Sequence, residues 1–261
     1  MRFLKQLLYG LFYLLILSGI TYGGYLAVSK PVQSCFDNIK NQNEEDVDCG
    51  GECIACALKN IQSIKSSAYF LTLDGINNAV ITLENPNIEY GAKDFVYTLE
   101  VYKSIIVPRP GEKTGLVKEV LFSLARDSFI YPGERKVIIE PNLKFDTKQI
   151  IGNPVIIISN PIWVPASEFT KPDVRVKTTE TLIVKQQAEI RGVISNLESF
   201  GLGKTVVNVM VQDSDIYPIG VTKTVFSNLK PFEERIFKIS TPLFKTPKGK
   251  TSVLFWTEAL K

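Results

Sequence analysis

The first clear pattern along the chain is an uninterrupted apolar run near the amino terminus. No charged residue occurs from Gln6 to Ser29, and Lys5 and Lys30 flank this run. About 20 residues of α-helix cross the hydrocarbon core of a bilayer. We therefore predict a transmembrane signal-anchor helix over residues 6–29, preceded by a cytoplasmic stub over residues 1–5.

The charges that flank this run predict its orientation. Arg2, Lys5 and the amino terminus lie before it, and positive charge favours the cytoplasmic side. We expect a single-pass protein of the cell membrane whose carboxyl-terminal bulk is extracytoplasmic. A cleaved signal peptide is the alternative, although its apolar region usually spans only about 7–15 residues.

From about Lys59 onward the pattern changes to short apolar–polar alternations separated by turn residues. Phe95–Tyr102 alternates with period two, and turn pairs such as Pro132-Gly133 separate such segments. Strands spaced by about ten residues predict β-sandwiches. Residues 160–172 contain three prolines and predict a linker or a crossing between two modules. We place module 1 at residues 59–165 and module 2 at residues 166–261. Residues 57–66 are compatible with a short helix.

The two modules also look like diverged repeats. In each, a strand leads to an asparagine, then to an alternating strand, and later to a proline turn that ends in glutamate. The corresponding pairs are Asn85 with Asn196, Pro132 with Pro231, and Glu134 with Glu233. The longer interval in module 1 fits a longer hairpin around residues 108–114.

All four cysteines lie in one segment, residues 30–58. They are Cys35, Cys49, Cys53 and Cys56. An even number of cysteines beside an export signal predicts two disulfides, and four cysteines allow three pairings. A Cys₄ zinc site is the first alternative, although its ligand spacing would be irregular. A redox-active Cys53-Ile-Ala-Cys56 is the second, although no thioredoxin-like βαβ pattern accompanies it.

The same segment is rich in oxygen ligands and is a candidate calcium site. Calcium takes six to eight oxygens from a flexible loop. The candidate ligands are Asp37, Asn41, Asn43, Glu44 and Asp48. They do not follow the register of an EF-hand, and a solvated, disulfide-tied loop is the alternative.

The segment from Cys35 to Cys56 resembles a cysteine motif of bacterial and archaeal membrane-anchored surface proteins. Its form here is C-x-D-x-x-x-N-x-x-E-x-x-V-D-C-G-G-x-C-x-x-C. That family often has glycine at the position of Asn38 and aspartate at the position of Asn43, and both differences weaken the calcium interpretation. The resemblance implies a surface location and no particular activity.

The order of strand, asparagine turn, alternating strand and proline turn is similar to immunoglobulin-like modules of bacterial extracytoplasmic proteins. These include the FxLYD type and the late-embryogenesis-abundant type 2. Val193-Ile-Ser-Asn196 and the segment from Val207 to Asp213 carry the closer match, with Gln212-Asp213 in place of the usual Tyr-Asp. The resemblance implies an all-β fold with two tandem immunoglobulin-like β-sandwiches.

Composition argues against several classes of activity. The chain contains no histidine, which removes the commonest general base and zinc ligand. Its net charge is +3 without a long basic run, so we expect no nucleic-acid partner. Gly201–Thr205 lacks the spacing of a phosphate loop and predicts a hairpin turn. Trp163 and Trp256 favour core or inter-module packing. We expect no enzyme, and no cofactor apart from the candidate calcium ion.

These observations favour a membrane-anchored extracytoplasmic structural or binding protein. Its partners would be the membrane and a protein or envelope polymer. The alternative is a tethered accessory subunit of a cell-envelope assembly, such as secretion, pilus or wall machinery.

Overall fold

The computed structural model describes residues 2–28, 35–41, 43–73, 75–107, 115–146 and 153–260. It divides into two compact units, Met1–Asn60 and Ile61–Lys261.

The first unit begins with helix α1, Arg2–Val28. Its segment Arg2–Tyr25 has a mean hydropathy of 1.6 and is long and apolar enough to cross a membrane, a property that amino-terminal signal sequences share. The helix includes Arg2 and Lys5, which the sequence placed in a separate stub. Ser29 and Lys30 lie outside the described residues.

The rest of this unit is mostly irregular. A single bridge joins Asp46 to Cys49, and a short 3₁₀-helix η1 spans Cys56–Leu58. The short helix considered for residues 57–66 does not form, because η1 ends at Leu58 and the first strand begins at Lys65.

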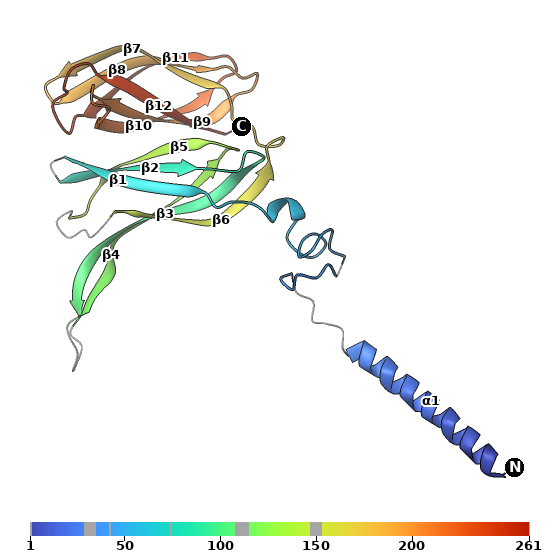
Figure 1. The fold of residues 1–261 in the computed structure, drawn as a ribbon. Coiled ribbons are helices and arrows are strands. Elements are labelled where there is room, and N and C mark those ends of the chain that lie inside the picture. The colour runs from blue at the N-terminus through green and yellow to red at the C-terminus, as the bar shows by residue number, and fades with distance from the viewer. Residues whose placement is uncertain are drawn as a thin grey trace. The chain divides into compact units, whose positions relative to one another are not determined.

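The described part of the second unit is built from twelve strands, shown in Figure 1. Those of module 1 are β1 Lys65–Leu73, β2 Ile76–Glu84, β3 Tyr90–Val107, β4 Gly115–Ile130, β5 Arg135–Leu143 and β6 Val155–Pro165. Those of module 2 are β7 Val174–Val184, β8 Gln187–Asn196, β9 Leu202–Gln212, β10 Pro218–Leu229, β11 Glu234–Pro242 and β12 Ser252–Ala259.

The strands form two sandwiches with the same topology. In module 1, sheet β1-β2-β5 faces sheet β4-β3-β6; in module 2, sheet β7-β8-β11 faces sheet β10-β9-β12. All pairings within these sheets are antiparallel. The four sheets lie in four successive layers (Figure 1). The predicted all-β fold with two tandem β-sandwiches is therefore confirmed.

Each sandwich has its own apolar core, supplied by alternate residues of its strands. Phe95 and Leu99 of β3 are buried in module 1, and Val207 and Val209 of β9 are buried in module 2. Trp163 packs against the first core, as expected. Burial of one such side chain contributes about 1.5–3 kcal/mol.

The repeat predicted from the sequence is visible in matching hydrogen bonds. The Asn85 side chain donates to the carbonyl oxygens of Tyr90 and Tyr131, at 2.7 and 3.0 Å. The Asn196 side chain does the same with Phe200 and Lys230, both at 2.9 Å. Each asparagine thus ties the turn after its own strand to the distant proline turn. These side chains replace backbone pairing where the chain crosses between sheets.

The proline turns match as well. The Glu134 carboxylate accepts a hydrogen bond from the Tyr131 amide at 3.0 Å, and Glu233 accepts one from the Lys230 amide at 2.7 Å. The third turn residue has a positive φ in both turns, Gly133 at 62° and Phe232 at 56°. Glycine suits this conformation, whereas phenylalanine does not.

Of two sequence predictions about connections, one is right in part and one is wrong. Residues 166–172 do connect the modules, but residues 160–165 belong to β6, an edge strand in which Pro161 lies in a bulge. Gly201–Thr205 is not a hairpin turn, because it leads into β9 after the chain has crossed from the sheet that contains β8.

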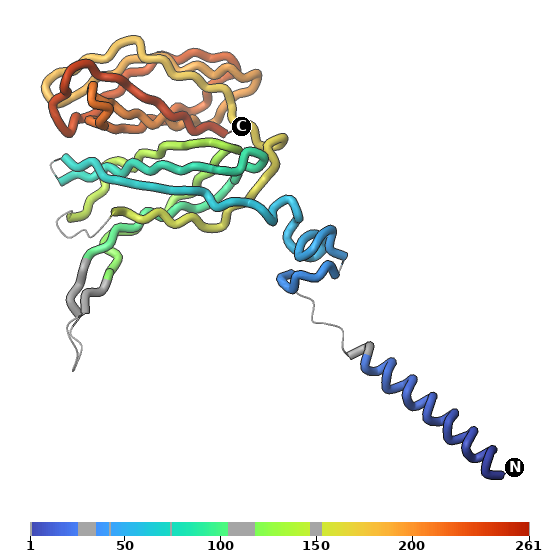
Figure 2. Tube along the Cα trace, viewed as in Figure 1, coloured from blue at the N-terminus to red at the C-terminus, as the bar shows by residue number. Residues whose placement is uncertain are grey.

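Strands β3 and β4 are longer than the others and continue as a two-stranded ribbon (Figure 1). Figure 2 traces the chain through the two sandwiches. β6 pairs with β3 only as far as Glu100, whereas β4 pairs with β3 as far as Val107. Residues 108–114, around which the longer hairpin was predicted, lie outside the described residues.

Candidate functional site

The four cysteines form two interleaved disulfides, Cys35–Cys53 and Cys49–Cys56. The structure thus selects one of the three possible pairings. Cys53 and Cys56 are each bonded to a different partner, so the local Cys-x-x-Cys is not itself a redox pair. All four thiols are consumed, which also leaves no thiolate for a Cys₄ zinc site.

The candidate calcium ligands mostly serve as hydrogen-bond acceptors within the loop. Asp48 accepts from the backbone amides of Asp37 and Asn38 at 3.0 Å. Glu44 accepts from the Asn41 amide at 3.0 Å and the Asp48 amide at 3.3 Å. A loop too short for its own core therefore satisfies its backbone with side chains.

The remaining calcium candidates are Asp37, Asn41 and Asn43. Asp37 accepts a hydrogen bond from the Asn41 side-chain amide at 2.9 Å, and the Asn41 side-chain oxygen is buried without a partner. Asn43 is exposed in a left-handed conformation. Among the described residues, no three His, Cys, Asp or Glu side chains lie together in a way that could hold a metal ion.

In the second unit, the most extensive site is the contact between the two sandwiches. An apolar cluster joins Val80, Val137 and Ile139 of sheet β1-β2-β5 to Met210 and Val221 of sheet β10-β9-β12. The ring of Trp256 packs against this cluster, so its predicted role in packing is confirmed. The outer face of one sheet in each module is thus buried against the other module.

Buried polar groups cross this contact beside the apolar cluster. The ammonium of Lys136, whose side chain is only 2% exposed, lies 2.8 Å from a carboxylate oxygen of Glu258. Asn208 accepts a hydrogen bond from the Ile139 amide at 2.9 Å and donates one to Glu258 at 2.7 Å. Asn208 thereby covers an unpaired backbone amide on the edge strand β5.

A second ionic group lies nearby. Glu140 accepts from the Tyr97 hydroxyl at 2.9 Å and pairs with Lys223 of module 2 at 2.8 Å. Burial raises the pKa of the Tyr97 phenol far above its ordinary value, and the negative charge of Glu140 adds to the effect. Tyr97 therefore stays protonated and donates its hydrogen bond at neutral pH.

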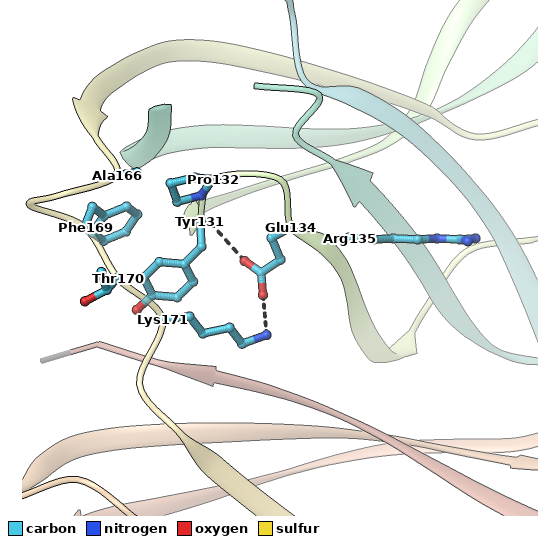
Figure 3. Close-up of a pocket in the computed structure, with 8 residues that line it drawn as sticks. All are labelled: Tyr131, Pro132, Glu134, Arg135, Ala166, Phe169, Thr170 and Lys171. Atoms are coloured by element: carbon cyan, nitrogen blue, oxygen red, sulfur yellow. Dashed lines mark hydrogen bonds and ion pairs between the residues drawn. The ribbon is translucent and has the colours of Figure 1, made fainter. Parts of the chain in front are cut away.

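The segment that connects the modules lines a shallow cavity of about 460 Å³, shown in Figure 3. The rings of Tyr131 and Phe169 stack there with centroids 4.4 Å apart, and Lys171 pairs with Glu134 at 2.6 Å. A Cβ on Gly91 would lie 2.6 Å from the Phe169 ring, so only glycine permits this contact. The Tyr131 hydroxyl donates to the Ala259 carbonyl at 2.6 Å, which ties the connection to the last strand.

A second cavity, of about 470 Å³, opens beside the contact between the modules. It is lined by Lys93, Asp94, Asp127, Ser128, Phe129, Gly203, Lys204, Val206, Glu258 and Leu260. Charged side chains of both signs, together with Phe129, therefore line this cavity.

The buried charged groups at the contact between the modules are better suited to holding the modules together than to catalysing a reaction. Lys136, Glu140 and Glu258 are each fixed by an ion pair and further hydrogen bonds. Such groups keep two modules in one orientation, which is useful for presenting a surface.

Sequence reasoning missed Lys136, Glu140, Asn208, Lys223 and Glu258 as a group. One signal was available: Val206–Val211 is apolar on both faces except for Asn208, which is typical of a strand buried on both sides. The partners of these residues lie far away in the chain, and no local pattern identifies them.

Comparisons with known proteins add little to this picture. No family model matches the sequence, and no curated protein matches it. Among solved structures, the chain is similar to red sea bream transglutaminase, with a TM-score of 0.25 and 11% identity. That similarity covers 78% of this chain but only 30% of the transglutaminase chain.

Proposed function

We propose that this protein is a membrane-anchored extracytoplasmic structural or binding protein whose tandem modules are immunoglobulin-like and act without catalysis. The observation that supports this most is the buried contact between the sandwiches. It holds the two modules together as one body, and the same chain carries a helix that is long and apolar enough to anchor them.

The immunoglobulin-like assignment rests on topology. Strands one, two and five form one sheet, and strands four, three and six form the other, in both modules. In immunoglobulin folds the first, second and fifth strands likewise share a sheet, opposite the third and sixth. Strand order specifies a fold and not a binding partner.

The extracytoplasmic location is supported by the two disulfides, which persist in oxidising compartments. The test is protease digestion of intact cells that express the full chain, followed by non-reducing peptide mapping. We expect digestion of residues 61–261 without lysis, and peptides linked as Cys35–Cys53 and Cys49–Cys56. Protection of those residues, or free thiols, would refute the proposed location.

A tethered accessory subunit of a cell-envelope assembly is the second candidate. The long β3–β4 ribbon favours it, because strands that extend beyond their sandwich are suited to pairing with another protein. Extraction in a mild detergent followed by affinity purification separates the two functions. A stoichiometric foreign protein would support the accessory role, and its absence would favour the first proposal.

A further inference from the structure

Two outer sheet faces of the second unit have no partner sheet among the described residues. The outer faces of β1-β2-β5 and β10-β9-β12 are buried against each other. The outer faces of β4-β3-β6 and β7-β8-β11 are left, and they differ sharply in chemistry.

The face of β4-β3-β6 is the counterpart of a face that is already used for docking. Sheet β4-β3-β6 occupies the same place in module 1 as β10-β9-β12 occupies in module 2. Thr98 and Asn208 lie equally far along the chain past Tyr90 and Phe200, the residues that accept from the two repeat asparagines. Thr98 is therefore the module 1 counterpart of Asn208, the residue of module 2 that contacts module 1.

The middle of this face is uncharged. Because Phe95, Tyr97 and Leu99 point into the core, the alternate residues of β3 point outward. Strand register then places Thr98 between Ala125 of β4 and Ile157 of β6, with Val96 and Val155 in the adjacent rows. Val155 and Ile157 are each 42% exposed.

The carboxylates of this face lie outside the row of Thr98: Glu100 and Asp127 lie in the two flanking rows, and Asp94 lies beyond Val96. Glu100 accepts a hydrogen bond from the Tyr102 hydroxyl. Asp127 lines the cavity that also contains Lys93 and Lys204. The carboxylates therefore lie beside the uncharged middle row of this face and not within it.

The face of β7-β8-β11 has the opposite character. Arg191 pairs with Glu180 at 3.1 Å and with Glu189 at 2.8 Å, and Lys238 pairs with Glu189 at 2.7 Å. Taking such a ladder out of water costs more than its pairs return. The charged face of β7-β8-β11 is therefore a poor partner for the uncharged face of β4-β3-β6. This disfavours head-to-tail stacking, in which these two faces of successive copies would meet.

We propose that the outer face of sheet β4-β3-β6 binds a second copy of this chain through the same face. The inference goes beyond the proposed function, because it names the partner of one surface. The chain's own module contact shows that the counterpart of this face docks a sheet. Pairing with a second uncharged face takes the fewest charges out of water. A two-fold pairing of identical faces closes as a dimer.

The test is sedimentation equilibrium of the full chain in a density-matched detergent. The wild type should sediment as a dimer. Ile157→Lys, and Thr98→Lys as a second variant, should weaken dimerisation by about 100-fold or more, because like charges meet in a desolvated centre. Val193→Lys, in the middle row of the β7-β8-β11 face, should leave the dimer intact.

Thermal unfolding of each variant shows whether it is folded. If Ile157→Lys is not folded, Thr98→Lys provides the test of dimerisation. A wild-type monomer, or a dimer that resists both substitutions, would overturn the proposal. Gly19 and Gly23 on α1 have the spacing of a helix-pairing motif. A dimer lost only in Gly23→Ile would place the contact in the anchor and equally refute the proposal.

Discussion

At the residue scale, the paired proline turns show how a repeat diverges under a constant backbone. Both turns keep a positive φ at their third residue, but module 2 places a phenylalanine there. The Phe232 side chain is 67% exposed, so it gains little packing in return. Local strain of this kind has no evident structural compensation in the described residues.

We therefore expect Phe232→Gly to raise the free energy of unfolding by about 1 kcal/mol. A residue with a side chain costs about 1–2 kcal/mol in the left-handed region, and glycine avoids this cost but loses more backbone entropy on folding. Thermal unfolding followed by circular dichroism measures the change. Gly133→Ala is the matched control in module 1 and should destabilise. A lower midpoint for Phe232→Gly would show that the phenyl ring makes a needed contact.

The buried phenols predict the alkaline limit of stability. Burial raises the pKa of both Tyr97 and Tyr131 in the folded chain, and nearby carboxylates add to each shift. A raised phenol pKa contributes stability that is complete below about pH 10, the ordinary phenol pKa, and is lost as pH rises above it. Thermal unfolding measured at a series of pH values from 9 to 11 should therefore show an unfolding midpoint that falls as the pH rises.

Tyr97→Phe should be less stable at pH 7, because Glu140 loses a donor, yet its midpoint should fall less steeply above pH 10. Tyr217→Phe, where the ring is 61% exposed, is the control and should keep the wild-type slope. Equal slopes in Tyr97→Phe and the wild type would contradict this account.

At the scale of elements, the cysteine loop illustrates how ligand-rich sequences can be used for folding. Both Asp48 and Glu44 accept hydrogen bonds from backbone amides, and within the described part of this loop only the Asn41 side-chain oxygen is buried and unpaired. Calcium needs six to eight oxygens.

We accordingly expect titration calorimetry of the oxidised full chain to show no calcium binding below about 1 mM. Asp48→Asn should weaken the loop, because a charged acceptor of two amides becomes neutral. Limited proteolysis between Cys35 and Cys56 reports this change. Saturable heat with calcium, abolished in Asp48→Asn, would restore the calcium site.

The sheets show why element-level predictions succeeded for most strands. Alternation in β3 and β9 follows from a core on one side, and that periodicity is local. The prolines of β6 misled the prediction of a linker, because an edge strand tolerates residues that cannot donate a hydrogen bond.

At the scale of the whole molecule, the contact between modules turns two repeats into one body. Its Lys136–Glu258 pair is almost fully withdrawn from water, which makes a broken pair far costlier than an absent one. Lys136→Met should lower the free energy of unfolding by about 3–5 kcal/mol, because Glu258 stays buried and unpaired.

The double variant Lys136→Met with Glu258→Leu should recover much of that loss. Chemical denaturation of the four chains in this mutant cycle gives the coupling energy between the two side chains. The pair Lys65 and Glu84, 3.9 Å apart and exposed, is the control and should show a coupling below about 1 kcal/mol. Additive effects of Lys136→Met and Glu258→Leu would contradict a direct interaction.

The sequence by itself determined the apolar helix, the period-two strands, the two-module repeat and the presence of a cysteine loop, because each is encoded by neighbouring residues. Tertiary structure alone decided which cysteines join, that Asn208 covers β5, and that Lys136 meets Glu258. These outcomes depend on distances between residues far apart in the chain, which are fixed only when the sheets pack. The outer face of β4-β3-β6 belongs to the same class: its residues look ordinary in sequence, and only the packed structure shows that its counterpart in module 2 is docked against a sheet.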